Sequence, residues 1–152
     1  MIVSDLLTEK RILPDLTAGS KAEVLAELSA LMEDSVPEVD GPGILEVIQE
    51  REDVSSTAIG NGVALPHGRL TGLQRVLVGF ARSRQGIDFD SLDGGSTHLF
   101  FILLAPEDSA AQHLKALAGL SRLLADDAFR RVLLEAPGDE LLGLIRERDG
   151  EA

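Results

Sequence analysis

Apolar side chains recur every three or four positions near both ends of the chain, while the middle carries short, continuous apolar runs. The first pattern predicts a helix over residues 20–34, and Ser20 with Glu23 forms a capping box at its start. A break at residues 41–43, Gly-Pro-Gly, precedes a second predicted helix over 43–52. The N-terminal third is therefore expected to be helical.

The C-terminal third repeats this helical periodicity. A third predicted helix opens at Ser109, which forms a second capping box with Gln112, and continues to about Leu124. Asp126 or Asp127 can cap a fourth helix, and residues 138–139 open the last one.

The middle of the chain favours strands. Residues 75–81 and 97–104 are rich in β-branched and aromatic side chains, and the second run, THLFFILL, is apolar on both faces, as in a central strand. The glycine-rich stretch 58–72 is expected to be a loop with a short strand, and 87–89 another short strand. Because strands lie between helical ends, we expect one α/β domain over residues 1–152. It would be a three-layer α/β/α fold whose central mixed β-sheet has helices on both faces.

The composition of the chain narrows the range of functions that it can have. The chain has 14 Lys and Arg against 26 Asp and Glu, a net charge of −12, and neither Trp nor Tyr, which disfavours nucleic-acid binding. The longest apolar run, residues 99–105, is too short to cross a bilayer, and the first residues lack the basic start and apolar core of a signal peptide. No cysteine is available for disulfides. We expect a cytoplasmic protein without membrane insertion.

The charge is unevenly distributed. Residues 54–87 contain no Asp or Glu but four arginines, Arg69, Arg75, Arg82 and Arg84. This positive segment in an acidic protein could mark an anion site, although a solvated strand edge or chance would give the same pattern.

Three histidines are candidates for chemistry. His67 stands between Pro66 and Gly68, which suits an imidazole presented where a strand leads into a loop, although the spacing alone favours a histidine in a tight turn. His113 lies near the start of a predicted helix, where a packed or half-exposed histidine is common, and His98 begins an apolar strand and is interpreted as structural. Their separations match no local zinc pattern, and no dinucleotide fingerprint or P-loop is present, so we expect neither metal nor cofactor.

The segment Thr57 to Gly68, TAIGNGVALPHG, resembles the phosphorylation-site segment of enzyme IIA domains of the fructose/mannitol type in the bacterial phosphotransferase system. The resemblance extends along most of the chain, through the sequence around Arg51, the FFILLAP run and Gln112-His113-Leu114. The N-terminal sequence is most similar to the stand-alone nitrogen-regulatory branch.

The resemblance implies that His67 accepts a phosphoryl group from a histidine phosphocarrier protein of the HPr or NPr kind, through a phosphohistidine intermediate. His113 would neighbour the acceptor ring, and Arg51 would hold the phosphoryl oxygens. We predict a regulatory phosphocarrier that acts on a regulatory target. The alternatives are a sugar-specific enzyme IIA that passes phosphate to a IIB partner, and a regulator that only binds. The oligomeric state stays open.

Overall fold

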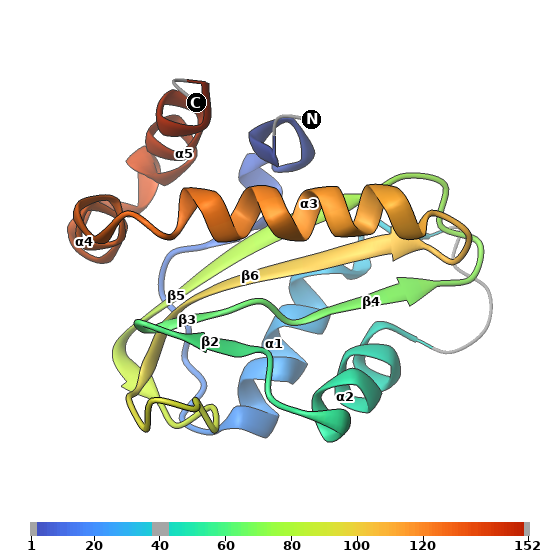
Figure 1. Cartoon of the computed structure of the whole chain (residues 1–152), viewed down its shortest axis with the longest axis horizontal. Coiled ribbons are helices and arrows are strands. Elements are labelled where there is room, and N and C mark those ends of the chain that lie inside the picture. The colour runs from blue at the N-terminus through green and yellow to red at the C-terminus, as the bar shows by residue number, and fades with distance from the viewer. Residues whose placement is uncertain (1–2, 38–42, 151–152) are drawn as a thin grey trace.

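A six-stranded mixed sheet forms the middle of the protein, whose computed structural model describes residues 3–37 and 43–150 (Figure 1). Its central strand is β6 (Thr97–Pro106), which pairs antiparallel with β5 (Leu77–Ile87); β5 pairs parallel with β1 (Ile12–Leu13). On its other side β6 pairs parallel with β3 (Val63–Ala64) and then with β4 (His67–Leu70), and β2 (Ala58–Gly60) pairs antiparallel with β3. Strands β3 and β4 thus share one edge of β6.

Helices cover both faces of this sheet (Figure 1). One face carries α1 (Lys21–Glu33) and α2 (Ile44–Val54). The other carries α3 (Ala110–Leu123), α4 (Asp127–Glu135), α5 (Leu141–Gly150) and the 3-10 helix η1 (Val3–Leu6). Two further 3-10 helices, η2 (Glu9–Arg11) and η3 (Gly138–Glu140), complete the described elements. The three-layer α/β/α prediction is confirmed. No helix in the described ranges is both long and apolar enough to cross a membrane.

The two cores meet at β6. Phe101 and Leu103 belong to the core beneath α3 to α5, whereas Phe100 and Ile102 belong to the core beneath α1 and α2. All four side chains are fully buried, so each contributes on the order of 2 kcal/mol of hydrophobic stabilisation. A strand buried on both faces is what its uninterrupted apolar sequence predicts.

Two of the three predicted helix caps are confirmed. The Ser20 hydroxyl accepts from the Glu23 amide at 3.3 Å and donates to the Glu23 carboxylate at 3.0 Å, and Asp126 accepts from the Ala128 amide at 2.9 Å. The capping box at Ser109 is wrong. Its hydroxyl donates to the Pro106 carbonyl at 3.1 Å, because the turn that ends β6 offers it a nearer partner.

The strands differ more from the prediction than the helices. β5 runs on to Ile87, so residues 87–89 form no separate strand, and β1 and β4 were not predicted. The last helix begins at Leu141, after η3, and residues 41–42 of the predicted break lie outside the described ranges. The unpredicted strands are short and exist through pairing with distant residues, which local periodicity does not report.

Candidate functional site

β4 presents the candidate nucleophile at an edge of the sheet. His67 is the first residue of β4, opposite Leu103 of β6, and the preceding Pro66 carbonyl accepts from the Leu103 amide at 2.9 Å. The predicted position at a strand-to-loop exit is therefore wrong, since the chain enters a strand here. Because side chains alternate along a strand, Gly68 faces α2, where a Cβ would meet Val47, and His67 shares the opposite face with Arg69.

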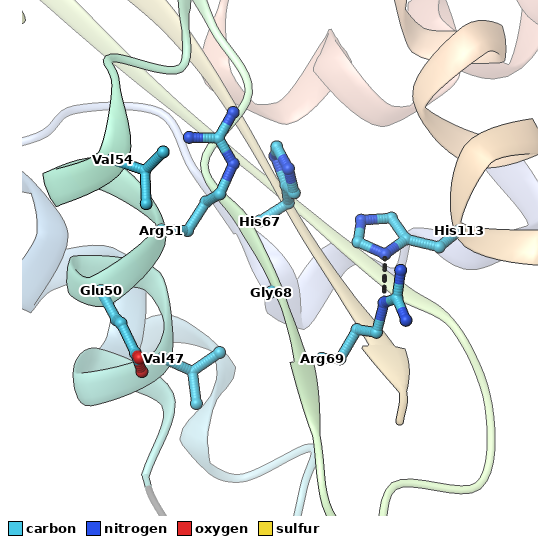
Figure 2. Close-up of a pocket in the computed structure, with 8 residues that line it drawn as sticks. All are labelled: Val47, Glu50, Arg51, Val54, His67, Gly68, Arg69 and His113. Atoms are coloured by element: carbon cyan, nitrogen blue, oxygen red, sulfur yellow. Dashed lines mark hydrogen bonds between the residues drawn. The ribbon is translucent and has the colours of Figure 1, made fainter. Parts of the chain in front are cut away.

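The site is a pocket of about 390 Å³ that spans this edge between α2 and α3 (Figure 2). Arg51 enters from the last turn of α2 and His113 from the first turns of α3, and the His67 ring lies between them. The side chains of Val47 and Val54 form the apolar part of the pocket wall. The structure thus brings together the three residues predicted for the site, from segments 16 and 46 residues apart.

A main-chain contact fixes the tautomer of His67. Its Nδ1 lies 2.7 Å from the Leu65 carbonyl oxygen. A carbonyl can only accept a hydrogen bond, so the proton is on Nδ1 and the lone pair is on Nε2. Partial burial lowers the pKa of His67, and the nearby Arg51 cation lowers it further, against the opposing effects of the Leu65 contact and Glu52. At neutral pH the ring is uncharged and Nε2 is a nucleophile.

His113 is the second imidazole, and it is more deeply buried, with 7% of its surface exposed. Its ring centroid lies 5.2 Å from that of His67, and the ring planes are inclined by 77°. Burial, then the adjacent His67 and then Arg69 lower the pKa of His113 to about 4, so this ring is also neutral. Its buried Nε2 has no hydrogen-bond partner among the described residues. An unpaired buried polar group costs about 1–3 kcal/mol, which a ligand oxygen could recover.

The buried carboxylate of Glu52 holds the chain that follows Arg51 close to α2. Glu52 accepts from both the amide and the hydroxyl of Thr57, and it also pairs with Lys21 at 3.2 Å. The chain between Glu52 and Thr57 is thereby held against α2. Within it, the Ser55 carbonyl accepts from Arg51 Nη1 at 2.9 Å, which orients the guanidinium beside His67.

The four arginines of the acid-free segment do not form one site. Arg69 lines the pocket with His67, Arg75 lines a separate pocket, and the exposed Arg84 pairs with Asp15 at 3.2 Å. Arg82 is fully buried and donates to main-chain carbonyls of Pro14, Leu133 and Ala136. The anion-site hypothesis therefore stays a prediction for Arg69, the one of the four that lines the pocket with His67.

His98 lies apart from the other two histidines. Its Nδ1 is 3.0 Å from the Ser83 carbonyl oxygen, and its ring packs at Gly86. Within the described ranges, no three His, Asp or Glu side chains are grouped as metal ligands.

Arg69 is the pocket residue that the sequence analysis left unassigned. Its Nε donates to Nδ1 of His113 at 3.4 Å, across the gap between β4 and α3 (Figure 2). The signal was present, because Arg69 stands two positions after His67 and strand alternation places both on one face. That rule could not be applied while residues 67–70 were interpreted as loop.

Comparison with known proteins gives consistent matches over nearly the whole chain. A family model, phosphoenolpyruvate-dependent sugar phosphotransferase system, EIIA 2, matches residues 5–147. A nitrogen regulatory protein of Bradyrhizobium diazoefficiens is 43% identical over 136 residues, 88% of this chain and 86% of that protein. A fructose-specific EIIABC component of Bacillus subtilis is 35% identical over 98% of this chain, which spans 24% of that protein. The crystal structure of nitrogen regulatory protein IIA-Ntr from Neisseria meningitidis superposes with a TM-score of 0.87 at 30% identity, covering 95% of this chain and 99% of that one.

Proposed function

The chain belongs to the EIIA 2 family of the phosphoenolpyruvate-dependent sugar phosphotransferase system, and from that premise we propose that His67 is its phosphoryl acceptor. Phosphoryl transfer is the general activity of this family's components, and the chain is a phosphocarrier of that system. The observation that supports the assignment to His67 is its free Nε2, which stands between a guanidinium and a second neutral imidazole in one pocket.

The transfer needs no proton movement at His67. The Nε2 lone pair forms a bond to phosphorus, while the phosphorus–nitrogen bond of the donor's phosphohistidine breaks and its electron pair returns to the donor ring. The proton stays on Nδ1, which donates to the Leu65 carbonyl throughout, so the ring keeps its orientation. Positioning and neutralisation of charge on the phosphoryl oxygens provide most of the catalysis in such reactions.

Arg51 and His113 would act on those oxygens from opposite sides. The Arg51 guanidinium supplies positive charge and several donors in a planar fork, which suits a phosphoryl group. His113, on the far side of His67, would donate from its unpaired Nε2. The donor would be a histidine phosphocarrier protein, itself charged from phosphoenolpyruvate.

A regulatory role of the nitrogen-regulatory type is the better supported of two candidates. The Bradyrhizobium relative bears that name and is 43% identical to this chain, whereas the fructose-specific relative is 35% identical. The second candidate is a sugar-specific enzyme IIA that delivers phosphate to a IIB protein. Its support is the fructose-specific relative, which is 35% identical over 98% of this chain. A structural neighbour of the same fold, enzyme IIAMTL of Escherichia coli, forms a complex with phosphorylated enzyme IIBMTL.

Incubation with phosphoenolpyruvate, enzyme I and the histidine phosphocarrier tests the acceptor. We expect acid-labile, base-stable labelling that is lost in His67→Ala and kept in the matched control His98→Ala. Labelling of the His67 variant at the wild-type rate would reject the assignment. Failure of every cognate donor to label the wild type would favour a protein that only binds. Transfer from labelled protein to a IIB domain would favour the sugar-specific role.

A further inference from the structure

The contact between Arg69 and His113 determines which ring nitrogen of His113 carries the proton. A guanidinium has only donors, so the nitrogen that faces Arg69 Nε at 3.4 Å, Nδ1, must be the acceptor. A neutral imidazole then has its proton on Nε2. Figure 2 shows the two nitrogens on different sides of the ring, with Nδ1 at the dashed line to Arg69.

The opposite nitrogen is buried without a partner among the described residues, in a ring packed edge-on against the proposed acceptor. An N–H group in that position is a donor available to a phosphoryl oxygen. In the other tautomer the same position would present a lone pair, which repels an anion. The tautomer therefore decides whether His113 assists or opposes the phosphoryl group.

We propose that Arg69 is a positioning residue, which holds His113 in the tautomer with its proton on Nε2 and so directs an N–H donor at the phosphoryl group of His67. The proposal rests on the proposed function of His67. Two separate elements make the arrangement: β4 places Arg69 on the His67 face, and the first turns of α3 bring His113 over it. The low pKa of His113, about 4, supports it, since only a neutral ring has two tautomers.

Nitrogen-15 NMR of the histidine rings in the unphosphorylated protein tests the first half without any phosphoryl donor. In the wild type, His113 should show the proton on Nε2. In Arg69→Met, which removes the donors but keeps a long side chain, we expect a mixture of tautomers, and Arg69→Lys should restore part of the wild-type pattern. The control Arg75→Met removes an exposed arginine outside the pocket and should change nothing. An unchanged His113 spectrum in Arg69→Met would overturn the proposal.

The second half is tested by the rate of phosphoryl transfer to His67. Arg69→Met should slow transfer about tenfold or more while the circular dichroism spectrum stays that of the wild type. In a His113→Ala background the same change should alter the rate less than twofold, because Arg69 acts through His113. An equal loss in both backgrounds would show that Arg69 contacts the phosphoryl group directly and would overturn the positioning role. Labelling that survives in His67→Ala would instead reject the proposed function, whatever the NMR result.

Discussion

The packing of β4 on α2 at Gly68 controls how far Arg51 lies from His67. A Cβ built on Gly68 would lie 2.3 Å from Val47 Cγ1, where ordinary contacts begin at 3.4 Å. The backbone of Gly68 is not in the left-handed region, so the obstacle to alanine is this clash alone. Val47 cannot easily turn away, because a β-branched side chain in a helix has one strongly preferred rotamer. Gly68→Ala must therefore move α2 and β4 apart.

The expected loss of stability is about 1–3 kcal/mol, as for other overpacked sites. The displacement also reaches the site, because Arg51 follows Val47 by four residues and lies on the same side of α2. Relief of the clash needs a separation of about 1 Å, from 2.3 Å to the shortest ordinary contact. A misplacement of that size can slow a positioned reaction on the order of 100-fold. We expect transfer to His67 to slow by tenfold or more.

Urea unfolding and the rate of labelling measure the two effects. Val47→Ala removes the atom that clashes, so Val47→Ala/Gly68→Ala should be more stable and faster than Gly68→Ala alone. Gly143→Ala is the matched control, because nothing lies within 4 Å of its Cβ, and it should lose neither stability nor rate. The reasoning is refuted if Gly68→Ala behaves like the wild type, or if removing the Val47 side chain brings no relief.

Two further predictions concern buried cations and protons. Arg82→Met should lower the free energy of unfolding by about 3–5 kcal/mol, because it leaves three main-chain carbonyls without the guanidinium that now donates to them. The control Arg84→Met removes an exposed ion pair and should lower it by less than about 1 kcal/mol. Equal losses in urea unfolding would contradict this. The pKa of His113 is about 4 in the folded protein, so between about pH 6.5 and pH 4 the unfolded chain binds a proton that the folded one excludes, and stability falls as pH falls. From pH 7 to pH 5 the wild type should lose about 1–2 kcal/mol more than His113→Asn, and parallel pH profiles would show that the ring is already protonated when folded.

The helices could be located from the sequence because their signals are local. The hydroxyl of Ser20 and the carboxylate of Asp126 cap helices as predicted, each within three residues of its partner. Ser109 shows the limit of this approach, since its competing partner, the Pro106 carbonyl, is close only because β6 ends in a tight turn. Strand β6 was predictable because its apolar sequence reflects burial on both faces.

From the sequence, only the site residues that belong to the family pattern could be predicted. His67, His113 and Arg51 were named from their resemblance to a family pattern, and the structure brings them into one pocket. Charge counting was less informative, because a charge along the chain does not say which way a side chain points. Of the four arginines within residues 54–87, Arg82 is fully buried and donates to main-chain carbonyls instead of facing an anion.

The missing strand and the missing site residue have a single cause. The sequence HGRL alternates polar and non-polar residues over only four positions, and Gly68, which is small where β4 packs against α2, weakens the strand signal further. The segment is a strand only because β6 supplies its hydrogen bonds from more than thirty residues away. Once β4 is recognised, the two-residue repeat places Arg69 beside His67 and under α3, where it contacts His113. The glycine that lets α2 approach the site thus weakened the local signal of the strand, and without the strand the sequence did not identify Arg69 as the residue that orients the second histidine.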